Sequence, residues 1–243
     1  MTAPALPLAL VTPLLRGARS LGRSALGFAL PQRCPGCGAA APARRVLCAG
    51  CRASIPRLRT PLCSRCLLAG DDPTGCMRHP GHHVFAPWLY DERAAAVVHA
   101  LKYGGRPGLA APLGRTLASA VPAPWRAADL VLEVPLHPAR ERERGYNQAA
   151  GLADALAGAL AVPRLPGALA RLRATPPQAR LGEAARRANV EGAFVVSRPS
   201  WLAGRRVLVV DDVMTTGATL AACLGALRAA GAKAAGVALA WTA

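Results

Sequence analysis

Residues 207–219 read Val-Leu-Val-Val-Asp-Asp-Val-Met-Thr-Thr-Gly-Ala-Thr, and this stretch decides the fold. Its β-branched start predicts a buried strand, which ends in the carboxylates Asp211 and Asp212. A loop of small hydroxyl and glycine residues follows and opens directly into a predicted helix over residues 217–230. The stretch therefore predicts a strand, a tight loop and a helix, with polar groups gathered where the strand ends.

The chemistry of this loop suits a phosphorylated sugar. The first turn of a helix presents unpaired N–H groups and the positive end of the helix dipole, which bind a phosphate well. Carboxylates beside a phosphate make sense if they accept hydrogen bonds from a sugar diol. A Walker B strand would need a GxxxxGK[ST] loop, which the chain lacks. The stretch predicts a site for a 5-phosphorylated ribose at the carboxyl edge of a parallel sheet.

The remaining pattern alternates strands with helices from residue 84 onward. Strands are predicted over residues 84–90, 129–135, 206–210 and 234–241, with two further candidates over 167–172 and 193–197. Helices are predicted over residues 91–103, 109–120, 146–160 and 217–230. This order predicts an α/β fold, a mostly parallel sheet with helices on both faces.

Seven of the eight cysteines crowd between Cys34 and Cys76, mostly as CxxC pairs. A CxxC turn places two sulfurs on one side of a bend, as tetrahedral zinc requires. Two pairs per ion predict two structural zinc sites, with these ligands: Cys34, Cys37, Cys48 and Cys51, then Cys63, Cys66, Cys76 and His79. His82 or His83 could replace His79, and disulfides or free thiols are the alternatives to zinc. Cys223 is expected to be a buried small residue.

Composition and charge set the broad class. Hydrophobic types make up 52% of the 243 residues, which excludes a disordered chain. We expect a basic helical segment over 1–30, a zinc-ribbon module over 31–83 and a larger domain over 84–243. Seven thiolates and two zinc ions lower the net charge from +17 to +14, which still fits polyanionic partners. With no apolar run of about 18 residues and no basic start of a secretory signal, we expect a cytoplasmic protein without membrane insertion.

The stretch at 207–219 resembles the phosphoribosyl pyrophosphate (PRPP) motif of type I phosphoribosyltransferases, and the chain from Cys34 onward resembles the ComF family. The resemblance includes residues 101–105, 134–138, 144–148, 175–181 and 186–194. It implies a ribose-phosphate site of Asp211, Asp212, Val213, Met214, Thr215, Thr216, Gly217, Ala218 and Thr219, in which the two carboxylates hold the ribose hydroxyls. The sequence departs from the family pattern at His79, where a cysteine is common, and at Ala185, where an acidic residue is common.

Further site residues are expected around this motif. The resemblance implies a pyrophosphate loop of Pro135, Leu136 and His137, with Arg140 just after it. Arg140 could instead lie on a solvated face balanced by acidic neighbours. Lys102, one of two lysines in the chain, is a candidate anion contact or an exposed helix end. Other residues could face the ligand or serve the fold: Tyr146, Asn147, Gln148, and the hood residues Gln178, Arg186 and Asn189.

Two classes of function remain open. An enzyme of this family would transfer ribose 5-phosphate from Mg²⁺-PRPP to an acceptor and release pyrophosphate, with Asp211 or Asp212 as the possible base. A non-catalytic binding or assembly factor would sense a phosphoribosyl ligand and dock DNA-uptake or recombination proteins, or single-stranded DNA, through the zinc module. The resemblance favours a role in natural transformation. Only 4% of the residues are aromatic, so DNA contact would be electrostatic.

Two mutational expectations follow from the sequence. Repulsion between neighbouring carboxylates predicts that Asp212→Asn leaves the stability of the unliganded protein unchanged or higher. A separate zinc module predicts that Cys34→Ser disturbs residues 31–83 and spares much of the later domain.

Overall fold

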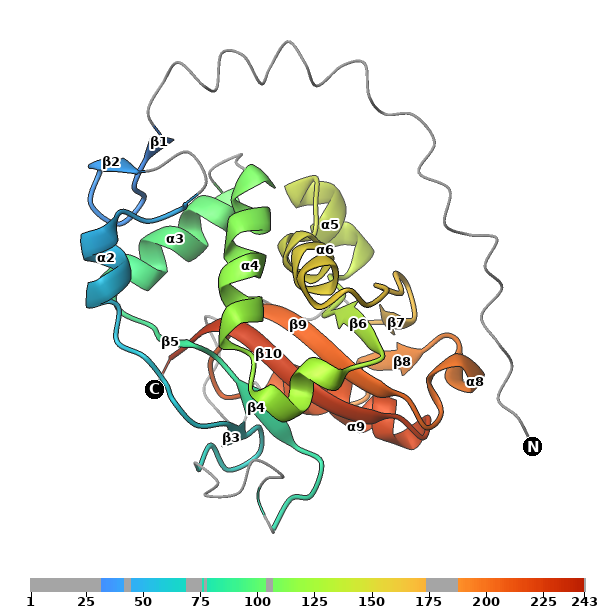
Figure 1. The fold of residues 1–243 in the computed structure, drawn as a ribbon. Helices are drawn as coiled ribbons and strands as arrows, with labels where there is room; N and C mark the ends of the chain where they lie inside the picture. Colours follow the sequence, from blue (N-terminus) through green and yellow to red (C-terminus); the bar gives the residue numbers. More distant parts are fainter. Residues whose placement is uncertain are drawn as a thin grey trace.

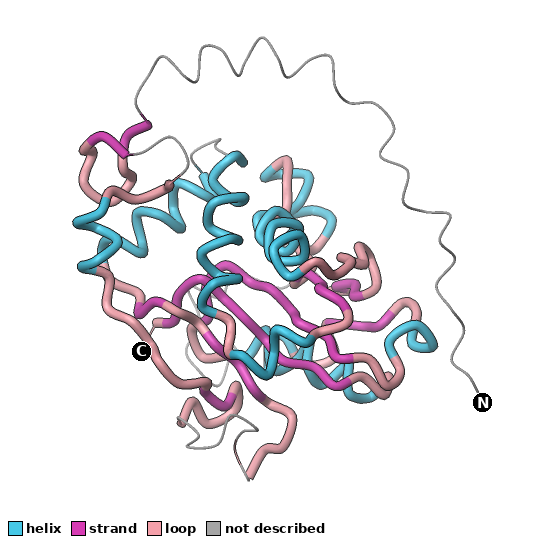
Figure 2. Tube along the Cα trace, in the orientation of Figure 1, coloured by secondary structure: helices cyan, strands magenta, loops and turns pink. Residues whose placement is uncertain are grey.

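The computed structural model describes residues 32–41, 45–68, 76, 78–103, 107–173 and 188–242. The predicted helical segment 1–30 and the hood residues Gln178 and Arg186 lie outside these ranges. Helices cover both faces of a central sheet (Figure 1). Figure 2 shows the same course of the chain by type of structure, with strands in the middle. Among the described residues, no helix is long and apolar enough to cross a membrane.

The central sheet has the strand order β3-β4-β10-β9-β6, and β5 also pairs with β10. These strands are β3 (Leu62–Cys63), β4 (His83–Phe85), β5 (Trp88–Leu89), β6 (Leu130–Glu133), β9 (Arg206–Met214) and β10 (Lys233–Trp241). Every pairing is parallel except that of β3 with β4. The predicted α/β class with a mainly parallel sheet is confirmed.

One face of the sheet carries the helices α3 (Glu92–Tyr103), α4 (Ala110–Ala120) and α6 (Gln148–Leu160). Their buried side chains, such as Leu101, Leu117 and Leu152, form one core with alternate residues of the strands. The helices α4 and α6 approach so closely that a Cβ on Gly114 would stand 2.4 Å from the Cβ of Ala155. The glycine permits this packing.

The other face carries α9 (Ala218–Ala229), the antiparallel pair of β7 (Leu169–Arg171) and β8 (Phe194–Val196), and the short α8 (Pro199–Leu202). A second core of buried side chains joins α9 to this pair and to the sheet. The short elements η2 (Pro107–Leu109), η3 (Ala123–Ala127) and α5 (Pro138–Arg144) connect the larger ones.

The cysteine-rich segment is integrated into this fold. It contains β1 (Gln32–Arg33), β2 (Ala40–Ala41) and α2 (Ala49–Ser54), and then β3, which extends the central sheet. The buried Cys34, Cys51 and Ile55 share a core with Trp88 and Leu117. The predicted boundary between residues 83 and 84 falls inside β4, and separate folding of the two segments stays a prediction.

Several elements differ from expectation for local reasons. The strand expected over residues 84–90 is two short strands, β4 and β5, interrupted at Ala86 and Pro87, where proline has no N–H to donate. The strand expected to end at Val210 continues to Met214, because β10 pairs with it as far as Trp241. The helix α5 was not expected.

Candidate phosphoribosyl site and metal clusters

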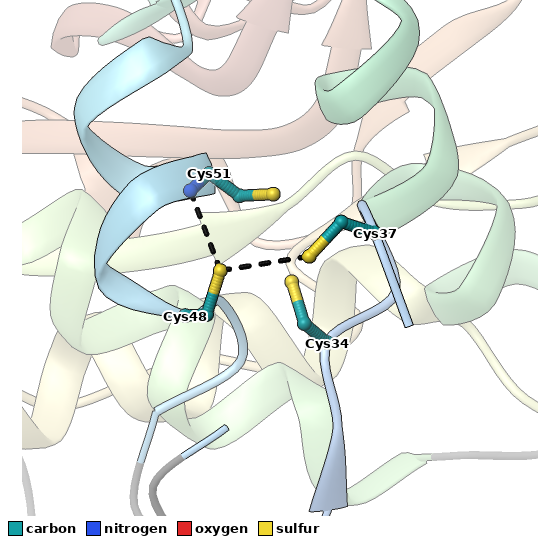
Figure 3. A group of neighbouring side chains, drawn as sticks. All are labelled: Cys34, Cys37, Cys48 and Cys51. Carbon is teal, nitrogen blue, oxygen red and sulfur yellow. Dashed lines mark hydrogen bonds between the residues drawn. The ribbon is translucent and has the colours of Figure 1, made fainter. Parts of the chain in front are cut away.

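The first cysteine cluster joins Cys34, Cys37, Cys48 and Cys51, whose sulfurs all lie within 4.8 Å of one another. Figure 3 shows the four side chains converging from two segments of the chain. The sulfurs of Cys37 and Cys48 are 3.6 Å apart, and the backbone N–H of Cys51 donates to the sulfur of Cys48 over 3.4 Å. Four converging sulfurs at this spacing fit a structural zinc ion with no open coordination position.

The second cluster joins Cys63, Cys66, Cys76 and His79. The Nδ1 atom of His79 lies 3.5 Å from the sulfur of Cys63 and 3.7 Å from that of Cys76. His82 does not join the cluster, because its Nδ1 faces the hydroxyl of Ser64 over 3.1 Å and its Nε2 faces Arg228. Among the candidate histidines, the structure thus brings His79 to the three sulfurs, and the set fits a second structural zinc ion.

The two carboxylates at the end of β9 have different surroundings. Each accepts a hydrogen bond from the next backbone N–H, Asp211 from Asp212 over 2.8 Å and Asp212 from Val213 over 2.7 Å. Asp212 is buried and faces α3, whereas Asp211 is partly exposed and lines a hollow with the loop after β9. Consecutive residues of a strand point to opposite faces, so the pair is divided between the two faces of the sheet.

Lys102 at the end of α3 forms an ion pair with Asp212, and its Nζ lies 3.0 Å from Oδ2. Burial alone would lower the pKa of Lys102, but the charge of Asp212 and the hydrogen bond to it raise that pKa. Lys102 is therefore partly buried and paired with Asp212, not an exposed helix end, and its role as an anion contact stays a prediction. The expectation that Asp212→Asn leaves stability unchanged or higher considered only the repulsion between Asp211 and Asp212. The ion pair with Lys102 was not part of it.

The pKa of the Asp211 carboxyl lies well above the usual value for aspartate. Burial, and then the negative charge of Asp212, raise the pKa of Asp211 to about 7. On β7, Arg171 lies close enough to Asp211 for the two charges to interact, and its guanidinium stands 5.4 Å from the centre of the Phe194 ring. Arg171 was not among the residues predicted for the site. The sequence feature that could have pointed to Arg171 is its position inside the apolar run Leu169-Ala-Arg-Leu172.

The loop after β9 turns into α9 at Gly217, which has a left-handed φ of +71°. Gly217 has no side chain that could cap the helix, so no side-chain capping hydrogen bond is made at this position. The hollow beside this turn measures about 20 Å³, close to the room that one water needs. The buried hydroxyl of Thr216 has no hydrogen-bond partner among the described residues.

Two further contacts hold this loop to the end of β10. The indole Nε1 of Trp241 donates to the carbonyl of Thr215 over 3.2 Å, and the N–H of Thr242 donates to the carbonyl of Met214 over 2.9 Å. Lys102, the two carboxylates and the loop 215–219 thus meet at the carboxyl edge of the sheet, as the topology requires.

The expected pyrophosphate loop follows β6, one strand away. The N–H of Val134 donates to the carbonyl of Val210, which places Pro135, Leu136 and His137 beside the end of β9. The Nδ1 atom of His137 accepts from the N–H of Ala139 over 3.2 Å and caps α5. On α5, Arg140 pairs with Glu143 over 3.5 Å. The arginine is partly exposed, which fits the solvated-face alternative.

Residues 146–148 make contacts within the fold, and a ligand role for them stays a prediction. The hydroxyl of Tyr146 donates to the carbonyl of Leu101, and Asn147 caps α6 through the N–H of Ala149. Gln148 is buried and accepts from Arg144 over 2.8 Å. The contact of Tyr146 ties this segment to the end of α3, next to Lys102.

Together, the fold and its site define a phosphoribosyltransferase-like domain joined to a double zinc ribbon. Residues 146–243 match the family "Phosphoribosyl transferase domain", and residues 25–77 match "Double zinc ribbon domain". The chain belongs to the ComF family.

Named relatives support this membership. The chain is 31% identical over 191 residues to "DNA utilization protein YhgH" of Salmonella typhi, covering 72% of this chain and 81% of that protein. It is 33% identical over 193 residues to the protein of the same name in Escherichia coli O157:H7, covering 77% and 80%. It is 31% identical over 194 residues to "Competence protein F" of Haemophilus influenzae (strain ATCC 51907 / DSM 11121 / KW20 / Rd), covering 73% and 82%.

Proposed function

We propose that the carboxyl edge of the sheet binds a 5-phosphorylated ribose, as in PRPP, with its phosphate at the start of α9. The start of α9 at Gly217, beside the carboxylates of β9, is the observation that carries this proposal. The residues proposed for the phosphate are 215–219, with Thr216 donating its hydroxyl. Asp211, which is partly exposed, accepts from the ribose hydroxyls, and Asp212 holds Lys102 toward the anionic end of the ligand.

If the protein is catalytic, the acceptor nucleophile bonds to C1 of the ribose as the C1–O bond to pyrophosphate breaks. Pyrophosphate leaves with the electron pair, and a proton from the acceptor passes to a carboxylate such as Asp211. Mg²⁺ would supply charge neutralisation to the pyrophosphate. The carboxylate of Asp211, on the open side of β9, is the group of this chain best suited to a hydrated cation.

The test is calorimetric titration with ribose 5-phosphate and with PRPP, each with and without Mg²⁺. Thr216→Val removes the buried hydroxyl and should weaken binding roughly tenfold, since a hydrogen bond to a charged group contributes about 1.5–3 kcal/mol. Thr116→Val is the matched control, because its hydroxyl bonds to the carbonyl of Pro112 within α4. Equal loss in both variants, or no binding by the wild type, would contradict the proposal. Pyrophosphate release with candidate acceptors then separates an enzyme from a binding factor.

A role in handling DNA is proposed as well, in the cytoplasm and alongside DNA-uptake or recombination proteins. The names of the relatives point to it. Within the described part of the ribbon segment, seven arginines are exposed: Arg33, Arg45, Arg52, Arg57, Arg59, Arg65 and Arg78. Such a surface suits the phosphates of single-stranded DNA, with affinity that falls steeply with salt.

Fluorescence anisotropy across a salt series tests this role. Arg52→Gln combined with Arg59→Gln should weaken DNA binding and reduce the salt dependence, whereas Thr216→Val should leave both unchanged. If the double arginine variant binds DNA as tightly as the wild type, the DNA interface lies elsewhere on the protein.

A further inference from the structure

The second metal cluster lies directly against the phosphate loop. A Cβ built on Gly217 would stand 2.7 Å from the carbonyl oxygen of Ser64 and 3.2 Å from its Cα. Ser64 is 1% exposed and lies between the cluster residues Cys63 and Cys66. The backbone of a zinc knuckle therefore forms the wall behind the residue at which the phosphate loop turns into α9.

His82 holds the backbone and side chain of Ser64 in place. The N–H of Ser64 donates to the carbonyl of His82 over 2.7 Å. Because the guanidinium of Arg228 can only donate, the Nε2 atom of His82 accepts from it. Since Nε2 accepts this bond, the ring proton lies on Nδ1, and the Nδ1–H of His82 donates to the hydroxyl of Ser64 over 3.1 Å.

The same segment also holds the far end of α9. Arg228 lies in the last turn of that helix and donates to the carbonyl of Pro80 over 2.6 Å as well as to His82. The helix that offers its first turn to the phosphate is thus attached to the second ribbon at both ends, by packing at Gly217 and by hydrogen bonds at Arg228.

We propose that Ser64 is a positioning residue for the phosphate loop, and that metal in the second cluster and a phosphoribosyl ligand stabilise one another's binding. The inference rests on the proposed function for its ligand. Cys63, Cys66, Cys76 and His79 fix the course of the chain through Ser64 when they hold a zinc ion, and Ser64 then fixes Gly217. Coupling of this kind is reciprocal, so a ligand on the loop also retains the metal.

Two matched variants test the coupling from the metal side. Cys76→Ser removes a ligand of the second cluster, and Cys37→Ser removes an exposed ligand of the first. Each should lose about one of two zinc equivalents by elemental analysis. Calorimetry should show ribose 5-phosphate binding roughly tenfold weaker in Cys76→Ser and within about threefold of wild type in Cys37→Ser. Equal affinities in the two variants would overturn the coupling.

Hydrogen exchange of the unliganded proteins separates this inference from the proposed function. Amides of residues 215–220 should exchange faster in Cys76→Ser and at the wild-type rate in Cys37→Ser. If the wild type binds no ribose 5-phosphate, the proposed function fails, and the exchange experiment still decides whether the cluster positions the loop. Unchanged exchange in Cys76→Ser overturns the positioning role.

The coupling can also be tested from the loop toward the metal, which covers the case in which Cys76→Ser does not fold. Gly217→Ala pushes a methyl group onto the Ser64 carbonyl, and it should speed release of one zinc ion to a chelator about fivefold or more. Gly225→Ala is the matched control on α9, because a Cβ there meets nothing within 4 Å. Release at the wild-type rate from Gly217→Ala would overturn the inference. With the wild type, ribose 5-phosphate should slow release of the same zinc ion only.

Discussion

The two metal clusters have similar ligand spacing but different places in the fold. The first packs into the helical core above the sheet, where Cys34 and Cys51 are buried with Trp88 and Leu117. The second lies at the edge of the sheet, where β3 carries Cys63 and Ser64 meets Gly217. Similar metal-binding sequences therefore have different surroundings, one in the helical core and the other beside the loop at residues 215–219.

The largest loss of stability is expected when a ligand of the first cluster is replaced. Cys51→Ser should lower the free energy of unfolding by about 3–5 kcal/mol, because a lost structural metal and a disturbed core both contribute. Contrary to the expectation for a separate module, hydrogen exchange should also rise in α3 and α4, which share that core. Cys76→Ser should lower the free energy of unfolding by a smaller amount, as measured by urea unfolding. A larger loss from Cys76→Ser, or full protection of α3 and α4 in Cys51→Ser, would contradict the comparison.

The next effect concerns the ion pair that α3 brings to the site. Asp212→Asn should lower the free energy of unfolding by about 2 kcal/mol, because it leaves Lys102 largely buried without its partner. Lys102→Met should also destabilise the protein by leaving Asp212 unpaired. The double variant should recover much of the loss, which a double-mutant cycle in urea measures. Additive losses would show that the pair contributes little.

A smaller effect concerns Asp211, on the side of the sheet that faces α9. Its pKa of about 7 exceeds the usual value near 4, so its favourable contribution is complete below about pH 4 and is lost as pH rises through 7. Asp211→Asn should match wild type at pH 4 and be more stable than wild type at pH 8, with the difference growing between these two values. Urea midpoints across this range check it, with the exposed Glu191→Gln as control. A constant difference between mutant and wild type would place the pKa elsewhere.

The smallest effect is a gain. Gly225→Ala lies within α9 in open space and should stabilise the protein by about 0.5–1 kcal/mol, because alanine loses less backbone entropy in a helix. The gain sharpens the comparison, since Gly217→Ala on the same helix should destabilise the protein through its left-handed φ and its contact with Ser64. Thermal unfolding of both variants distinguishes the two glycines.

Local patterns were enough to predict much of this molecule. The run from Val207 to Thr219 predicted a strand, a loop and a helix, because each depends on neighbours in the sequence. The CxxC spacing predicted both clusters for the same reason, since a short turn alone brings two sulfurs together. The cap at Asp91, whose carboxylate accepts from the N–H of Ala94 over 2.8 Å, was predictable too.

Other features depend on residues far apart in the chain. Lys102 and Asp212 pair across more than a hundred residues, and nothing in either local pattern shows that they meet. The choice of His79 over His82 depended on Arg228, which occupies His82 from the far end of α9. The extension of β9 to Met214 required β10 as its partner.

By itself, the sequence determined the class of fold, the two metal clusters and the loop that suits a ribose phosphate, because periodicity, spacing and turn chemistry act over a few residues. Only the tertiary structure decided that Asp211 and Asp212 face opposite sides of the sheet with different partners, and that a zinc knuckle stands behind Gly217. Those outcomes depend on which surfaces pack together when distant segments bury their apolar side chains, and packing is a property of the whole chain.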